Sequence, residues 1–240
     1  MSTTHDLLAF DLGAESGRAL LGRFDGDRLA LDDIHRFPNT PVRVPDGLHW
    51  DVLRLWGEIK QGIALARQQP GANLRSLGLD TWGVDFGLLA SDGSILGNPV
   101  CYRDARTQGM FDHAFACMSR RRVFDLTGIQ FMELNTLYQL LALKRVRPRQ
   151  LESAATMLLM PDLFNYLLTG VARAESSIAS TTQLIDVQTG GGSGEVVRAV
   201  GVPRSTSFFR ARWGGFSGPS GLRDRPKRGG ARARRTRGSA

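Results

Sequence analysis

The segment Asp11–Arg18 combines an acidic residue, two glycines and a basic residue between two apolar runs. The second run leads to Asp25-Gly26, and Asp-Gly between apolar runs is typical of a β-hairpin turn. The glycine loop therefore lies between two predicted strands. Rossmann folds and P-loops place their glycines directly before a helix, and neither of their motifs occurs here. The pattern indicates a phosphate site built from the amides of a hairpin.

Each residue type in this loop suits phosphate and metal binding. Gly13 and Gly17 let the backbone turn sharply and approach a large anion, and consecutive amides form a concave anion site. Asp11 could hold Mg²⁺, directly or through water, because Mg²⁺ takes few protein carboxylates and keeps several waters. Arg18 could flank a phosphate. An ordinary hairpin with a glycine-rich turn explains the same residues equally well.

A second candidate site is Asp80–Phe86, which joins two strand-like runs and contains two carboxylates, a tryptophan and a glycine. Carboxylates bind sugar hydroxyls, and an aromatic face covers the apolar side of a sugar ring. The alternative is that Trp82 and Phe86 belong to the core while the two acids cap turns. Tyr102–Thr107 places three charged residues on a loop before a predicted helix, and it could complete a polyol site beside Asp80–Phe86.

Strands that alternate with amphipathic helices surround these segments. Residues up to about 37 read as strands, and apolar residues within 52–63 fall on one helical face after the N-cap residue Asp51. Further apolar runs at 74–81 and 84–90 precede a mostly helical half. This order predicts an α/β domain.

Prolines and glycines mark the boundaries of other elements. Pro38, Pro41 and Pro45 predict a loop before the first helix. In the helical half, a short buried strand is expected at 157–160, followed by a helix that begins at Pro161 and ends at Gly170.

The composition is that of a globular protein. Of the 240 residues 42% are hydrophobic, but no run approaches the ~20 apolar residues of a membrane span. No secretory signal pattern is visible, and the two cysteines and four histidines have neither disulfide-framework nor metal-site spacing. We therefore expect a cytoplasmic location, where cysteines stay reduced, and no membrane partner.

The net charge of +8 is concentrated in one part of the chain. Residues 198–240 carry 12 Lys and Arg but one acid, which leaves 19 basic and 22 acidic residues, a net charge of −3, in residues 1–197. Residues 206–240 are dominated by Arg, Gly, Pro, Ser and Ala, so we expect a disordered basic tail. Such tails can bind nucleic acids, but no serial Arg-Gly-Gly repeat is present and we expect no nucleic-acid partner.

Taken together, the chain resembles the N-terminal domain of the FGGY family of carbohydrate kinases, and within it most closely the rhamnulokinases. The matching stretches are Asp11–Arg18, Leu48–Asp51, Asp80–Phe86, Tyr102–Thr107, Thr127–Phe131, Asn135–Leu140, Pro161–Gly170 and Ala179–Leu184. The likeness continues to about residue 205. We therefore assign residues 1–197 to the kinase N-terminal domain and 206–240 to the tail.

The resemblance implies an actin-like, ribonuclease H-like α/β fold and a cleft shared with a second domain. It implies phosphoryl transfer from ATP-Mg²⁺ to the 1-hydroxyl of L-rhamnulose, in the breakdown of L-rhamnose. The implied nucleotide-binding residues are Asp11, Gly13, Ala14, Glu15, Ser16, Gly17 and Arg18, and Asp11 would hold the Mg²⁺. Gly83 would contact the sugar, and by looser inference the same pocket is lined by Trp82, Asp85, Arg103, Asp104 and Asn135.

The resemblance leaves out the catalytic step. In this family the base is an aspartate in a His-Asp-Thr stretch at the start of the second domain, and no such stretch occurs in this sequence. We assign no catalytic residue to the chain, which could be inactive alone. The alternatives are a sugar-binding half-domain without turnover and a kinase for another ketose, such as L-fuculose or D-xylulose. The sequence leaves the oligomeric state open.

The abrupt loss of the family pattern after residue 205 leads to a prediction about the gene. We expect that a frameshift, genuine or a sequencing error, produces the Arg-rich tail. Resequencing from the codon of Asp186 onward and translating every frame tests this. A neighbouring frame should encode a His-Asp-Thr stretch and a nucleotide domain, and the hypothesis fails if no frame does.

Overall fold

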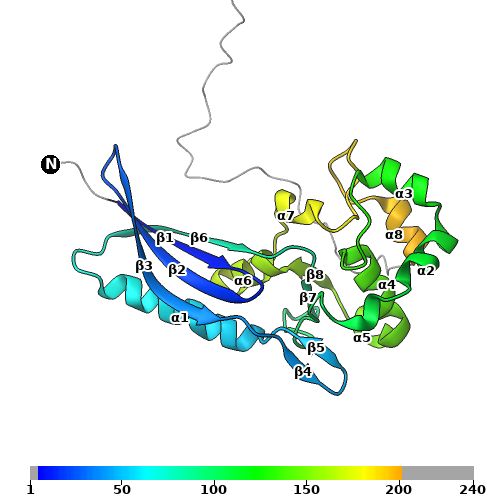
Figure 1. Ribbon diagram of the computed structural model, residues 1–240, viewed down its shortest axis with the longest axis horizontal. Coiled ribbons are helices and arrows are strands. Elements are labelled where there is room, and N and C mark those ends of the chain that lie inside the picture. Colours follow the sequence, from blue (N-terminus) through cyan, green and yellow to red (C-terminus); the bar gives the residue numbers. More distant parts are fainter. Residues whose placement is uncertain (1–4, 202–240) are drawn as a thin grey trace, which may run out of the picture.

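The computed structural model describes residues 5–201, so the tail expected at 206–240 lies outside the described residues. A four-stranded sheet with helices against one face adjoins a mostly helical half (Figure 1). These two parts correspond to two hydrophobic clusters, one between the sheet and its helices and one within the helical half.

The sheet has the strand order β3-β2-β1-β6. The strands β1 (His5–Leu12), β2 (Ser16–Phe24) and β3 (Leu29–Pro38) pair antiparallel, and β6 (Leu74–Thr81) runs parallel to β1. The strands predicted up to residue 37 and at 74–81 are therefore confirmed. One hairpin leads from β1 to β2, which places the glycine loop at the end of the sheet where β6 also ends.

Helices α1 (Val52–Gln68) and α6 (Met160–Thr169) cover one face of the sheet. Side chains alternate along β1, so that Leu8, Phe10 and Leu12 are buried against these helices while the residues between them face the open side. The Asp51 side chain caps α1 by accepting a hydrogen bond from a backbone amide of the first turn, as predicted.

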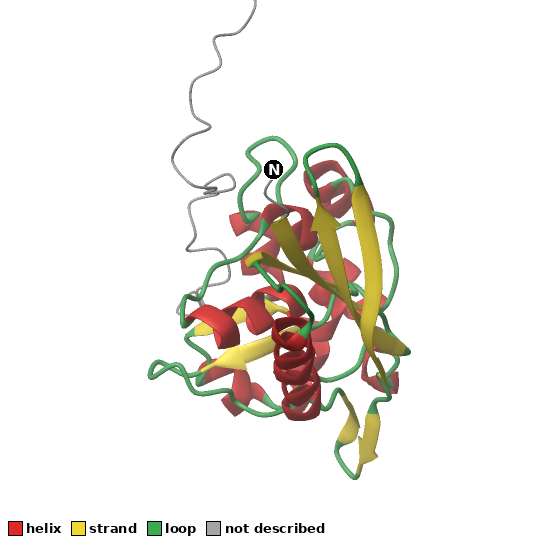
Figure 2. Ribbon diagram, turned by 90° about the vertical axis from the view of Figure 1, so that its left-hand side faces the viewer, coloured by secondary structure: helices red, strands yellow, loops and turns green. Residues whose placement is uncertain are grey.

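The loop predicted from the three prolines is wrong in part, because a short hairpin forms there. Strand β4 (Val42–Val44) pairs antiparallel with β5 (Gly47–His49). Pro41 precedes β4 and Pro45 lies in the turn, so neither proline removes an amide that the ladder needs. The hairpin projects from the lower end of the molecule (Figures 1 and 2).

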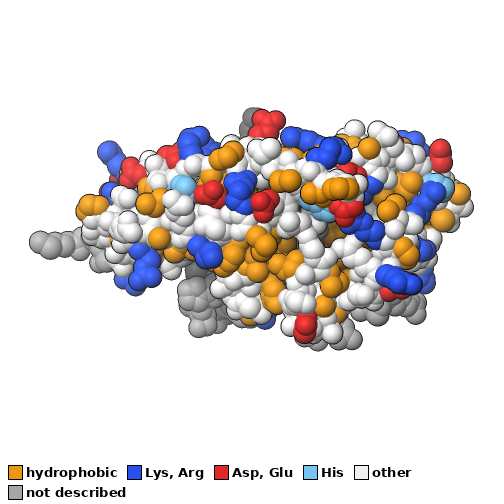
Figure 3. Space-filling model, turned by 90° about the horizontal axis from the view of Figure 1, so that it is seen from below, with side chains coloured by type: hydrophobic (Ala, Val, Ile, Leu, Met, Phe, Trp, Pro, Cys, Tyr) orange, Lys and Arg blue, Asp and Glu red, His pale blue; other side chains and the backbone are white. Residues whose placement is uncertain are grey.

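Seen from below, the molecule shows hydrophobic side chains gathered over its middle and charged side chains around them (Figure 3). Val42 and Val44 of the hairpin are among the exposed large hydrophobic residues. A hollow of about 240 Å³ lies beside them, and its lining also includes His49, Trp50 and Asn98.

A second small sheet joins the two halves of the molecule. Strand β7 (Phe86–Leu89) pairs antiparallel with β8 (Thr156–Leu159), and all of β7 is buried. The run predicted at 84–90 is thus a strand that begins two residues later, because Val84 lies in a turn. The helix expected between Pro161 and Gly170 is α6, and Gly170 ends it in a left-handed conformation.

The helical half surrounds α4 (Thr136–Val146), whose first eight residues are all buried. Its other elements are η1 (Ala105–Thr107), α2 (Met110–Cys117), α3 (Arg120–Thr127), α5 (Pro148–Glu152), α7 (Ser176–Ser180) and α8 (Gly194–Val200). Because α4 is buried, its first eight residues carry no charge, and the basic residues Lys144 and Arg145 come only in its last turn.

Two glycines of α1 give a matched test of this packing. A Cβ at Gly62 would lie 2.6 Å from the ring of Phe10, whereas a Cβ at Gly57 would meet nothing within 4 Å. We expect Gly62→Ala to lower the free energy of unfolding by about 1–3 kcal/mol through overpacking. Gly57→Ala should raise it by about 0.5–1 kcal/mol through helix propensity. Urea unfolding measures both, and a stabilised Gly62→Ala variant would contradict the packing of α1 on β1.

Candidate functional site

Charged side chains form a row across the open face of the sheet, at the end where β1 and β6 stop. Asp11 on β1 lies opposite Arg18 on β2 and beside Asp80 on β6, and Arg18 in turn lies opposite Arg36 on β3. The Oδ2 atom of Asp11 accepts hydrogen bonds from Arg18 Nη2 (2.7 Å) and Nε (3.0 Å). Strand pairing therefore places two carboxylates and two guanidinium groups together.

This row fits a metal-bound polyphosphate. Asp11 and Asp80 are partly or fully exposed carboxylates at adjacent strand ends, and Mg²⁺ typically takes one or two such ligands together with water and phosphate oxygens. Arg18 stands beside them as a phosphate partner. Asp80 was not among the predicted metal ligands. Asp80 is far from Asp11 in the sequence, and only the pairing of β6 with β1 shows that the two carboxylates are neighbours.

The loop between β1 and β2 is a tight turn. The amide of Gly13 donates to the carbonyl of Ser16 (2.9 Å), and Asn39 binds the carbonyls of Gly13 and Glu15 from outside. A Cβ at Gly17 would overlap the ring of Phe37, so the core beneath the loop requires glycine at this position. Gly17 is also one of the two glycines that the sequence predicts to let the backbone approach an anion.

Arg103, one of the predicted sugar residues, reaches the loop between β1 and β2. Its guanidinium lies 3.7 Å from the carboxylate of Glu15 and over the ring of Tyr102, 5.4 Å from its centroid. The structure thus brings both predicted clusters to the same end of the sheet.

Residues 82–84, which we call the tryptophan turn, follow β6 directly. Trp82 is half-buried and its ring lies 4.2 Å from that of Trp50. A Cβ at Gly83 would come within 3.1–3.3 Å of the Thr181 side chain, so glycine fits closely here. Val84 has φ of +66°, which is rare for a β-branched residue.

The surroundings of the turn hold Val84 in this strained conformation. Its carbonyl accepts hydrogen bonds from the Thr136 hydroxyl (2.7 Å) and Gln139 Nε2 (3.3 Å), and its amide donates to the Thr181 hydroxyl (3.2 Å). Strain of this kind persists only where the neighbouring structure enforces it, and it concentrates at functional sites.

Two residues expected to line the sugar pocket are fully buried instead. Asp85 has no exposed surface, and its carboxylate accepts four hydrogen bonds from the protein. Asn135 is also completely buried, and its Nδ2 donates to the Gln130 carbonyl and to Gln183 Oε1. Residue type suggested contact with sugar, whereas the structure places both side chains beneath the residues that reach the surface.

Asp104, another residue expected to line the sugar pocket, is only partly buried. Its Oδ1 caps η1 by accepting from the Arg106 amide (3.0 Å), and its Oδ2 accepts from the Leu48 amide (2.8 Å). These two hydrogen bonds anchor the loop that presents Arg103.

Residues 5–201 contain neither a membrane-spanning helix nor a cluster of metal-binding side chains. None of the helices there is long and apolar enough to cross a membrane. Within the same residues, no group of three or more His, Cys, Asp or Glu side chains could hold a metal ion, so a metal here would depend on a few carboxylates and on other oxygen ligands.

Comparison with known proteins identifies the family. Residues 7–210 match the model of the FGGY family of carbohydrate kinases, N-terminal domain. The chain belongs to this family. A rhamnulokinase of Bacteroides thetaiotaomicron is 43% identical over 197 residues, covering 82% of this chain and 40% of that protein. A rhamnulokinase of Klebsiella pneumoniae is 42% identical over 205 residues, covering 85% and 42%. The FGGY chain thus spans about two fifths of the length of these curated relatives.

Solved structures of sugar kinases share the fold of this FGGY chain. A gluconate kinase from Lactobacillus acidophilus superposes with a TM-score of 0.74 at 15% identity, over 86% of this chain and 42% of that one. A xylulose kinase from Rhodospirillum rubrum gives 0.72 at 21% identity, over 83% and 42%. The expected actin-like α/β fold is therefore confirmed.

One buried acid anchors the segment that leads to Thr181. Asp162, in the first turn of α6, accepts a hydrogen bond from the Glu175 amide (3.1 Å), while its other oxygen is buried without a partner among the described residues. Burial raises the pKa of Asp162 to about 7, against the effect of that hydrogen bond. Glu175 in turn caps α7.

This acid predicts an unusual pH dependence of stability. The folded protein holds the Asp162 proton up to about pH 7, whereas the unfolded chain releases it near pH 4. The contribution of Asp162 to stability is therefore fully present below pH 4 and falls as the pH rises to 7, by at most about 4 kcal/mol. Urea unfolding at several pH values should show this loss, and Asp162→Asn should remove it. An unchanged pH profile in the variant would contradict the assignment.

Proposed function

We propose that this chain forms the ketose-binding and phosphate-binding half of a kinase that phosphorylates L-rhamnulose at its 1-hydroxyl with ATP. The observation that carries the proposal is the position of the tryptophan turn directly after β6, which sets it beside the row of Arg18, Asp11 and Asp80. Identity of 42–43% to proteins named rhamnulokinase supports the choice of substrate.

Each exposed residue has a role in this proposal. The amides of residues 14–16 and the guanidinium of Arg18 bind the nucleotide phosphates, and Asp11 with Asp80 holds Mg²⁺. When bound, Mg²⁺ neutralises charge on the transferred phosphate. The ring of Trp82 covers the apolar side of the sugar while the Gly83 backbone approaches it closely.

The polar side of the sugar faces the loop after β7. Arg103 donates hydrogen bonds to hydroxyl groups, and Asp104 keeps this loop in place. The reaction belongs in the cytoplasm, where ATP is available. We assign no catalytic base to this chain, so the chain alone binds the ketose without turnover.

Calorimetric titration of the chain with L-rhamnulose, L-fuculose and D-xylulose tests the substrate. We expect the tightest binding for L-rhamnulose and no formation of ADP when ATP and Mg²⁺ are added. Tighter binding of D-xylulose would favour a different ketose kinase, a choice that the structural likeness to xylulose kinases leaves open. Absence of binding to all three sugars would contradict the proposal.

Two arginines of β2 provide a matched test of phosphate binding. Arg18 pairs with Asp11 in the row, whereas Arg23 pairs with Asp32 (3.4 Å) near the far end of the strand. We expect Arg18→Gln to weaken Mg-ATP binding about tenfold, since a charge-assisted hydrogen bond contributes about 1.5–3 kcal/mol. Arg23→Gln should leave the affinity unchanged in the same calorimetric assay. Equal affinities of the two variants would remove Arg18 from the site.

A further inference from the structure

Gln139 is a fully buried residue of α4 that lies beneath the tryptophan turn. Its Nε2 donates to Asp85 Oδ1 (2.8 Å), to the Leu134 carbonyl (2.9 Å) and to the Val84 carbonyl (3.3 Å). Its Oε1 accepts from Arg106 Nη2 (2.6 Å). One amide side chain therefore contacts a guanidinium on one side and a carboxylate on the other.

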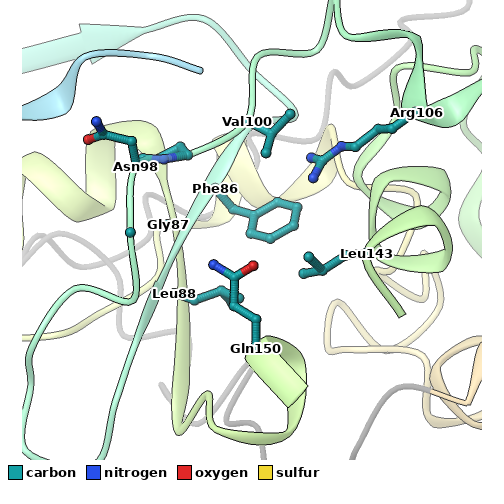
Figure 4. A pocket seen from close by; sticks show the side chains of 10 residues that line it. Phe86, Gly87, Leu88, Asn98, Val100, Arg106, Leu143 and Gln150 are labelled. Carbon is teal, nitrogen blue, oxygen red and sulfur yellow. The ribbon is translucent and has the colours of Figure 1, made fainter. Parts of the chain in front are cut away.

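Arg106 supplies positive charge to this arrangement. Its side chain points toward Phe86 and Leu143, beside a cavity of about 20 Å³ (Figure 4). Burial lowers the pKa of Arg106 to about 10, and attraction by Asp85 and Asp104 opposes this effect. The guanidinium therefore remains charged at neutral pH.

Asp85 supplies the negative charge. Burial raises the pKa of Asp85, and the hydrogen bonds from its four donors oppose that shift. Every one of these partners is a donor, which suits an ionised carboxylate and leaves no acceptor for a proton. Gln139 stands between this carboxylate and Arg106, and it offers a donor to the first and an acceptor to the second.

We propose that Gln139 is a positioning residue for ketose binding. It couples the charge of Arg106 to Asp85, and it thereby fixes the Trp82 indole and the strained Val84 peptide in the orientation that receives the sugar. The inference rests on the proposed function. Only a side chain with both a donor and an acceptor can do this, and an apolar side chain of similar size would leave Arg106 and Asp85 without their shared partner.

The competing interpretation is that Gln139 adds stability and nothing else. Leu141 provides the control, because it lies two residues further along α4, is buried and belongs to the hydrophobic cluster of the helical half. The variants Gln139→Met and Leu141→Ala should both lower the melting temperature. Near-ultraviolet circular dichroism then reports the paired rings of Trp50 and Trp82, and Trp82→Phe identifies their signal.

We expect Gln139→Met to change the tryptophan signal and to weaken L-rhamnulose binding about tenfold, the effect of one unpaired buried polar group. Leu141→Ala should keep the wild-type signal and affinity. A folded Gln139→Met with wild-type signal and affinity would overturn the proposal.

Two variants of Arg106 keep the test decisive if Gln139→Met does not fold. Arg106→Lys retains the charge and should preserve the tryptophan signal, whereas Arg106→Met should change it. Identical signals in the two variants would contradict coupling through Gln139. If the wild-type chain binds no L-rhamnulose, the proposed function fails, and the circular dichroism comparison alone decides whether Gln139 positions the tryptophans.

Discussion

The buried carboxylate of Asp85 connects four segments that are distant in the sequence. Its oxygens accept hydrogen bonds from the indole nitrogens of Trp50 (2.6 Å) and Trp82 (3.0 Å), the amide of Tyr102 (3.1 Å) and the side chain of Gln139 (2.8 Å). A buried charge is tolerated only when its partners stay in place. The first turn of α4, the loop after β7, the segment before α1 and the tryptophan turn are therefore fixed relative to one another.

Strand register sets the other half of the site. Asp11, Arg18 and Asp80 share the open face of the sheet because β1 lies between β2 and β6. A slip of one residue would turn each of these side chains toward α1 and bring apolar residues to the surface. Burial of Leu8, Phe10 and Leu12 on the opposite face thus keeps the charged row together. The same strand register therefore buries the apolar core on one face of the sheet and forms the proposed phosphate site on the other.

The sequence predicts the elements whose signals are local. Apolar runs bounded by turn residues identify the strands of the sheet, and the cap at Asp51 identifies the start of α1. The β4–β5 hairpin escapes prediction because prolines also suit hairpin ends. The roles of Asp85 and Gln139 escape it for a different reason. Their partners lie up to 55 residues away, and residue type cannot distinguish an acid that faces a sugar from one beneath it.

The most direct test of this account is the NMR signal of the indole Nε1–H groups in the chain labelled with ¹⁵N-tryptophan. Two of the indole protons, those of Trp50 and Trp82, should resonate downfield and exchange slowly with water, because both donate to the carboxylate of Asp85. Both signals should move together in Asp85→Asn. Rapid exchange of either proton, or a shift of only one of them in the variant, would contradict the claim that a single buried carboxylate holds the site.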